Sequence, residues 1–424
     1  MNALNIFLLQ TPVPKDIPLP LPLPEWLLVG LLIISFLLHI LFVNLMLGGT
    51  LLTLWAELKG MKNKDYDTLG KEIAKTVTVN KSLAVVLGVA PLLTINALYT
   101  IYFYSANAMT GTFWIMIIPF VIVAFLLIYW HKYSWDSMKN KNFHIALIAL
   151  GSLIFLFVPL IFLTNINIML FPERWHEVEG FFSAMIMWNV IPRYLHFLAA
   201  SLAITGLFLF WWMSRKKYPV SALFKQFSKT DIKRKWYKLA LYASLSQIVL
   251  GPLNLFTLPW DNVSIGLIYI ITIGALIAIG AMYMIWRELR GPEEKLGQNF
   301  YKIALALTVV VLFMGTGRHV YRAVSLAPHQ EAMAAKTKDF RQRAALAMQE
   351  AQAASKLKTA EIILQDEMTI EMRQQIMQLL KGIGGVQNIR FDPQQRSVTY
   401  DAEPGIADPA DISKKIEALG YGVR

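Results

Sequence analysis

The sequence contains no cysteine. Disulfide bonds, iron–sulfur clusters, thiolate zinc sites and covalent haem attachment through Cys-x-x-Cys-His are therefore excluded. Charged residues are also scarce, because they make up 16% of the chain against 56% for hydrophobic residues, whereas soluble domains have nearer a quarter charged residues. We therefore expect lipid to solvate much of the chain, and His, Met, Asp, Glu or Tyr to hold any metal or cofactor.

The hydrophobic segments lack acidic residues. About 20 apolar residues span the hydrocarbon of a bilayer, and this length predicts about eight spanning helices, at residues 27–56, 82–104, 112–131, 144–165, 191–213, 238–258, 262–286 and 300–320. No Asp or Glu lies inside these ranges, and Glu25, Glu57 and Asp261 lie at their edges. Proton pumps and proton-coupled transporters usually rely on buried carboxylates, so this class of protein is disfavoured.

Basic residues gather in every second connection between the predicted helices. These connections are 59–81, 132–141, 215–238 and 287–295; the connections 105–111 and 257–262 have no Lys or Arg, and 166–190 has only Arg174. The positive-inside rule places the basic connections in the cytoplasm. We therefore expect both termini on the outer side of a bacterial cytoplasmic membrane, and the net charge of +12 needs no nucleic-acid partner.

The N-terminal residues predict an extended lead-in on the outer side. Residues 1–10 have no basic region, and no small-residue cleavage site follows them, so a cleavable signal peptide is not expected. The Pro-rich stretch 11–24 is typical of polyproline conformation. We therefore interpret residues 1–25 as a lead-in to the first spanning helix.

The hydrophobic part of the chain repeats itself. The predicted first helix contains His39 and Gly49, and the fifth contains His196 and Gly206 at the same spacing of ten residues. The second and sixth helices each contain a Pro in similar surroundings, at positions 91 and 252. Such internal similarity predicts two related four-helix units in the same orientation.

Three histidines are expected at one depth of the membrane. His39 and His196 lie about fifteen residues from the predicted inner aromatic belt, or roughly 23 Å into a ~30 Å core, and His319 ends the last spanning helix on the same outer side. Neutral imidazole is a usual axial ligand of haem iron, although a histidine in a membrane helix also serves by bonding a neighbouring helix. Three nearby arginines could pair with haem propionates, namely Arg193, Arg318 and Arg322.

The other four histidines lie in connections or at helix ends, where a structural role is the simpler interpretation. They are His131, His144, His176 and His329. His176 is the most interesting, because it lies beside Trp175 in an acidic outer connection. That connection could form an amphipathic segment that contributes to a quinone or partner site.

The C-terminal residues change character. Residues 331–358 are rich in Ala, Gln, Lys and Arg and predict an exposed connecting helix. Strands are predicted at 361–365, 386–391 and 397–400, helices at 369–382 and 409–418, and a last short strand at 421–424. This βαββα order, closed by a fourth strand, is typical of a ferredoxin-like domain. We therefore expect an all-α membrane domain at 26–325, a helical linker at 326–358 and a small α+β domain at 359–424.

Short motifs in residues 25–325 resemble subunit I of the cytochrome bd quinol oxidases. The segment 38–48, LHILFVNLMLG, is similar to that family's His-Phe-Leu-Phe-Val-Pro-Leu-Thr-Leu-Gly, whose His ligates a haem. The helix with His196 resembles the fifth helix of the family, which supplies another haem ligand, and Gly-Arg-His-Val-Tyr at 317–321 is similar to its Gly-Arg-Gln-Pro-Trp. The resemblance implies one or two haem b groups, two four-helix units and an outward N-terminus.

The sequence also departs from that family. A haem-ligating Glu precedes the family's Gly-Arg by two residues, where this chain has Gly315. The family's long quinol-binding loop between helices six and seven is reduced here to residues 257–262. We therefore expect a relative that keeps haem b without the oxygen-reducing centre.

The C-terminal domain is similar to heavy-metal-associated domains, with a difference at the metal loop. Met368 aligns with the Met of their Met-x-Cys-x-x-Cys loop, but Ile370 and Arg373 stand at the thiolate positions. Met368 and Met372 could contact Cu(I), although packing in the domain core is the simpler role. A docking or assembly function is favoured for this domain.

Together these features predict a haem b membrane protein that passes electrons between the quinone pool and a partner at the outer face. The partners would be other subunits of a respiratory complex or a c-type cytochrome. Three alternatives remain from the sequence: a non-catalytic membrane anchor, a metal or haem transporter, and a complete bd-type quinol oxidase.

Overall fold

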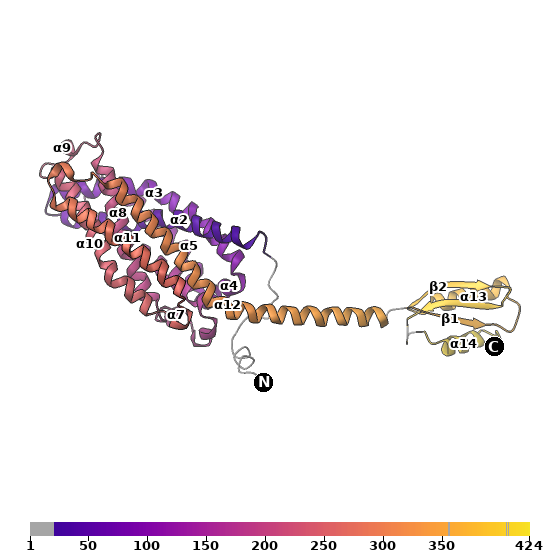
Figure 1. The fold of residues 1–424 in the computed structure, drawn as a ribbon. Helices are drawn as coiled ribbons and strands as arrows, with labels where there is room; N and C mark the ends of the chain where they lie inside the picture. Colours follow the sequence, from indigo (N-terminus) through magenta and orange to yellow (C-terminus); the bar gives the residue numbers. More distant parts are fainter. Residues whose placement is uncertain (1–20, 355–356, 404, 406) are drawn as a thin grey trace. The chain divides into compact units, whose positions relative to one another are not determined.

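The computed structural model describes residues 21–354, 357–403, 405 and 407–424. The chain divides into two compact units, Met1–Ala332 and Met333–Arg424, and each is considered by itself (Figure 1). Most of the lead-in expected at residues 1–25 lies outside the described residues.

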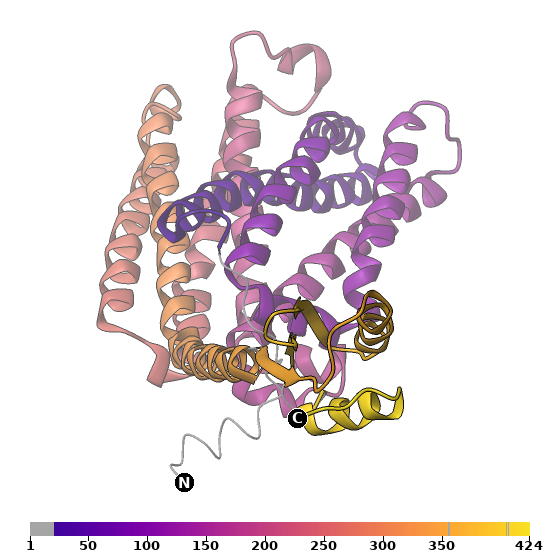
Figure 2. The same ribbon diagram turned by 90° about the vertical axis from the view of Figure 1, so that its right-hand side faces the viewer.

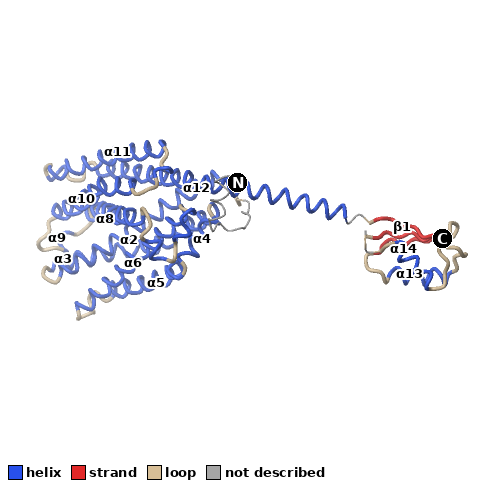
Figure 3. The backbone as a smooth tube through the Cα atoms, turned by 90° about the horizontal axis from the view of Figure 1, so that it is seen from below, coloured by secondary structure: helices blue, strands red, loops and turns tan. Residues whose placement is uncertain are grey.

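The first unit is a bundle of long helices that run alongside one another (Figures 1 and 3). The long helices are α2 (Glu25–Gly60), α3 (Lys64–Leu98), α5 (Thr112–Tyr133), α6 (Lys141–Leu170), α8 (Val190–Ser214), α10 (Lys229–Phe256), α11 (Ile265–Arg290) and α12 (Phe300–Ala354). Shorter ones are α4 (Thr100–Thr110), α7 (Phe181–Met185), α9 (Val220–Leu223), η1 (Pro172–Glu177), η2 (Trp260–Asn262) and η3 (Glu293–Lys295). Among the described residues, 7 helices are long and apolar enough to cross a membrane, or up to 8 if a bent pair counts as one span.

The bent pair corrects the predicted helix at 82–104. The chain turns by 113° between the apolar end of α3 and α4, at Tyr99, whose φ of −130° and ψ of 38° are not helical. Pro91 lies inside α3 and does not end it. Hydropathy could not show this bend, because the residues on both sides of Tyr99 are similarly apolar.

The apolar side chains on the outside of the bundle identify an integral membrane protein. On α5, Ile115 and Ile118 are 70% and 68% exposed, and only Ala124, Ile128 and His131 of this helix are buried. A water-soluble protein rarely exposes large contiguous apolar surface. Lipid is the solvent that accommodates such a face.

The first helices of the two expected four-helix units pack directly against each other. Each pairs closely with the helix that follows, α2 with α3 and α8 with α10, and α2 also packs on α8. At this contact the hydroxyl of Ser201 donates to the side-chain oxygen of Asn44 at 2.8 Å, and the hydroxyl of Thr205 donates to the Asn44 carbonyl at 3.1 Å. The bundle is seen from a second direction in Figure 2.

Asp65, in the first turn of α3, is hydrogen-bonded to the basic connection between α8 and α10. Its carboxylate is buried and accepts hydrogen bonds from the backbone N–H groups of Lys225, Gln226 and Phe227, at 3.1, 2.5 and 3.3 Å. These three donors stabilise the ionised form, and they lower the pKa of Asp65 against the opposing effect of burial.

Replacing Asp65 by asparagine should destabilise the first unit by about 2 kcal/mol, because hydrogen bonds to an ionised acceptor are the stronger ones. Since the folded-state pKa of Asp65 is depressed, its contribution is complete above the ordinary pKa of about 3.9 and is lost as pH falls through the folded value. Thermal unfolding in detergent at neutral pH measures the effect. Asp136→Asn is the control, because Asp136 is exposed and pairs only with Lys71; equal stability of both variants would contradict the prediction.

The second unit contains a small antiparallel sheet. Its strands are β1 (Lys358–Ile363), β2 (Val386–Asp392) and β3 (Ser397–Ala402), in the order β1-β3-β2. Helices α13 (Ile370–Lys381) and α14 (Pro409–Ala418) lie on one side of it (Figure 3). The fourth strand is a single bridge between Leu364 and Val423, so the ferredoxin-like order is confirmed with a shorter closing strand than predicted.

Both methionines of the aligned metal loop lie inside the second unit. Met368 and Met372 are buried in a core with Ile376, Val398 and Tyr400. A buried thioether that packs against a sheet is not presented to an ion from solution. The structure therefore gives no support to Cu(I) binding at these residues.

Candidate functional site

The side chain of His39 packs between helices α2 and α3. Its Nδ1 lies 2.8 Å from the carbonyl oxygen of Ala84. A Cβ atom at Gly88 would come within 2.8 Å of the imidazole, so the glycine makes room for the ring. An N–H donated from Nδ1 to a carbonyl leaves Nε2 unprotonated, as in most histidines that ligate a metal.

His196 lies on α8 in a strongly cationic setting. Its Nδ1 is buried without a hydrogen-bond partner among the described residues, while its backbone carbonyl accepts from the Nε2 amide of Gln247 at 3.0 Å. The positive charges of Arg318 and Arg193 both act on the ring. Residues of α8 and α12 that were predicted as site residues are therefore brought together.

His319 and the arginines lie near one another, toward the end of the bundle that was predicted to face outward. The Nδ1 of His319 is also buried without a partner in the described part of the chain, and the charge of Arg322 acts on it. The guanidinium of Arg318 lies 5.4 Å from the Phe36 ring, and that of Arg322 lies 5.3 Å from the Tyr99 ring.

The three arginines are cations without carboxylate partners. Among the ion pairs of the described residues, none includes Arg193, Arg318 or Arg322. Arg193 and Arg322 are buried, and both of their charges act on Arg318. Buried charges are normally paired, so this cluster of like charges fits an anionic ligand.

Gly48 and Gly206 lie where helices pack closely against one another. A Cβ atom at Gly48 would lie 2.6 Å from the carbonyl oxygen of Ser201, at the contact between α2 and α8. A Cβ atom at Gly206 would lie 3.0 Å from the backbone of α10. These positions permit close helix packing.

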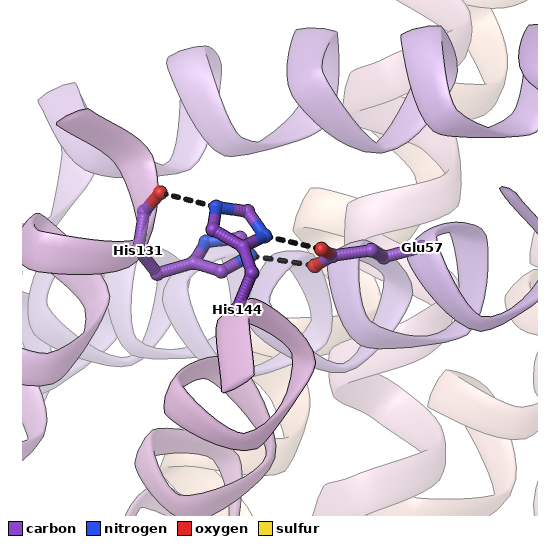
Figure 4. Close-up of side chains that lie close together, drawn as sticks. All are labelled: Glu57, His131 and His144. Atoms are coloured by element: carbon purple, nitrogen blue, oxygen red, sulfur yellow. Dashed lines mark hydrogen bonds and ion pairs between the residues drawn. The ribbon is translucent and has the colours of Figure 1, made fainter. Parts of the chain in front are cut away.

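A second cluster, which sequence analysis did not foresee, lies at the end of the bundle that was predicted to face the cytoplasm (Figure 4). Glu57 of α2, His131 of α5 and His144 of α6 are 0%, 0% and 1% exposed. Oε2 of Glu57 lies 2.6 Å from Nε2 of His131, and Oε1 is bonded to Nδ1 of His144. The structural role expected for the two histidines was therefore incomplete, because α2 continues to Gly60 and carries a carboxylate into the protein interior between them.

The two remaining histidines lie in and near the outer connection. His176 is 63% exposed, whereas Nε2 of His329 lies 3.1 Å from a carboxylate oxygen of Glu173. This connection folds into η1 and α7 and exposes Phe182 and Ile186. The connection is therefore helical in part; its amphipathic character and its role in a quinone or partner site are still predictions.

Comparison with known proteins identifies a solved structure with a similar fold. No family model matches the chain, and no curated protein matches it. Among solved structures, the bd oxidase from Geobacillus thermodenitrificans is similar at a TM-score of 0.56 and 14% sequence identity, over 71% of this chain and 88% of that chain. The chain therefore has a bd-oxidase-like fold, as the motifs at 38–48 and 317–321 predicted.

Proposed function

We propose that this protein is a haem b-containing electron-transfer subunit of the bacterial cytoplasmic membrane, with both termini on the outer side. It would pass electrons between the quinone pool and a redox partner at the outer face. The observation that carries the proposal is the outer cluster, in which buried arginines without carboxylate partners lie beside imidazoles with free ring nitrogens. A haem b group combines an iron that imidazole ligates with two propionates that arginine binds.

The residues divide between ligation and charge. His39, His196 and His319 would ligate the haem iron, because Nδ1 of His39 is bonded to a backbone carbonyl and the Nδ1 atoms of His196 and His319 have no hydrogen-bond partner among the described residues. The propionates would be bound by Arg193, Arg318 and Arg322. This pairing would offset the free-energy cost of burying the three charges without partners. Bound haem supplies one-electron redox chemistry, which suits exchange between a two-electron quinol and a one-electron partner.

The structure favours electron transfer over oxygen reduction. Where the bd oxidases have a haem-ligating Glu, a Cβ atom at Gly315 would lie 3.2 Å from Cδ2 of Leu37. This position is therefore filled by packing between α12 and α2, with no carboxylate to ligate iron. The connection that bears quinol in that family is here the single turn η2 between α10 and α11.

The partners would be other subunits of a respiratory complex. A c-type cytochrome at the outer face is the simplest electron partner for haem near that face. The second unit has its own core, and it would serve as the docking module for such a subunit. No nucleic acid is expected, because the basic connections are accounted for by membrane orientation.

Reduction by a quinol tests this function. Full-length protein in detergent should be reduced by a quinol analogue such as duroquinol, as judged by the b-type α-band after anaerobic mixing, and should not consume oxygen when quinol is supplied. If dithionite reduces the haem and quinol does not, then quinone is excluded as an electron-transfer partner of this protein. Steady oxygen consumption would show instead that the chain is an oxidase.

A further inference from the structure

We propose that Glu57, His131 and His144 bind a divalent transition-metal ion of the zinc class at the inner end of the bundle. This site is independent of the proposed haem, because Glu57 is eighteen residues beyond His39 on α2, or roughly 27 Å along a helix. Two imidazoles and a carboxylate are the donors of many zinc and non-haem iron sites.

The three side chains present their donor atoms to one small region. One ligand atom from each of Glu57, His131 and His144 can be chosen so that all lie within 4.8 Å of one another. All three groups are buried in the described structure, and they come from three different helices that meet at this end of the bundle (Figure 4). Convergence from separate helices is how bundle proteins build metal sites.

The surroundings of His144 orient it as a metal ligand. Its Nε2 lies 2.8 Å from the backbone carbonyl oxygen of His131, so Nε2–H donates there and Nδ1 faces Glu57. A ring nitrogen bound to a backbone carbonyl is the common outer support of a ligating imidazole, since it fixes the tautomer and the ring plane. The indole of Trp135 packs edge-on against both rings, at 5.0 Å from each centroid, and restricts their rotation.

The cluster has more negative than positive charge when its imidazoles are neutral. Lys141 lies 2.8 Å from Oε1 of Glu57 and 2.6 Å from Oδ1 of Asp67. With neutral imidazoles, the two carboxylates exceed this single ammonium by one negative charge. A bound dication would change the net charge of the cluster from −1 to +1, and Lys141 would keep Asp67 as its partner when Glu57 turns to the ion.

A proton on His144 is the competing source of positive charge. Doubly protonated His144 would donate from Nδ1 to Glu57 and from Nε2 to the His131 carbonyl, and the cluster would then be a buried ion pair. His131 separates the two accounts in part, because its Nδ1 is buried without a partner in the described residues. Ligation through Nε2 would put a proton on this Nδ1 with no acceptor among the described residues, whereas donation from Nε2–H to Glu57 leaves only an unused Nδ1 lone pair. This atom therefore favours the ion pair, and the convergence of the three donor atoms carries the metal site.

Binding of zinc distinguishes the metal site from the buried ion pair. Untagged full-length protein, stripped with a chelator and dialysed against micromolar Zn²⁺, should retain a stoichiometric amount of zinc by mass spectrometry, and zinc should raise its thermal unfolding midpoint relative to chelator. Glu57→Gln and His144→Ala should lose this zinc. His176→Ala is the matched control and should retain it, because His176 is exposed on the outer connection.

Two results would overturn the metal site. Wild-type protein that binds no zinc, and whose stability zinc leaves unchanged, would show that the cluster is an ion pair. Zinc retained by His144→Ala at the wild-type level would place the ion elsewhere. Because wild-type protein alone gives the first result, the test stands even if the variants do not fold, and its readout does not depend on haem.

Discussion

Replacing His196 by alanine is expected to abolish the b-type absorption of the haem that we propose it ligates. His196 has a buried, unpartnered Nδ1 and lies within the field of Arg193 and Arg318. Alanine removes the iron ligand and leaves the arginines without the anionic group that would compensate them. Reduced-minus-oxidised spectra and extracted haem content measure the loss, and His39→Ala should remove absorption in the same way.

His176→Ala is the control for general effects of removing a histidine. Its ring is exposed, and among the described residues it contacts the Glu173 carbonyl and the Glu177 carboxylate of its own turn. This variant should keep the full spectrum. An unchanged spectrum in His196→Ala, in protein that elutes as the wild type does, would exclude His196 as a haem ligand.

Replacing Gly48 by alanine is expected to destabilise the first unit by about 1–3 kcal/mol or more, because added volume in a packed contact forces backbone shifts. The new Cβ would lie 2.6 Å from the Ser201 carbonyl and against the hydroxyl of Thr205. The backbone of α8 cannot yield as a flexible side chain can. The two hydrogen bonds from Ser201 and Thr205 to Asn44 would be broken with it.

Gly30→Ala is the matched control for Gly48→Ala, because both residues lie on α2 and Gly30 has nothing within 4 Å of an added Cβ. There the better helix propensity of alanine predicts equal or higher stability, by up to about 1 kcal/mol. Thermal unfolding in detergent compares the two variants. A similar midpoint for both would show that α2 and α8 are not packed as described.

The sequence was sufficient for seven of the eight predicted spanning helices, and the eighth is the bent pair formed by α3 and α4. Length and apolarity decide these, and both can be read locally. The bend at Tyr99 could not be predicted, because its neighbours on both sides are equally apolar and only tertiary packing selects the non-helical residue. For the same reason, the close contacts of Gly48 and Gly206 with neighbouring helices could not be predicted.

The two clusters differ in how far the sequence pattern around each residue can predict them. His39, His196 and His319 could be singled out from the sequence as candidates, because an ionisable residue in an apolar helix stands out. Glu57, His131 and His144 lie at helix ends, where polar residues are ordinary. Because the basic connections put many charged residues at the same helix ends, these three do not stand out in the sequence. A signal existed: His131 and His144 flank the short connection after α5, and the predicted orientation puts Glu57 at the same level. Only helix packing shows that all three are buried together.

The reduced-minus-oxidised absorption spectrum of the purified full-length protein tests the central claim most directly. We predict an α-band at the position of b-type haem, with no band of the haem d type, since the position of the oxygen-reducing centre's Glu is Gly315. Protein that is folded and homogeneous in detergent, yet shows no haem absorption after expression with ample haem, would contradict the account.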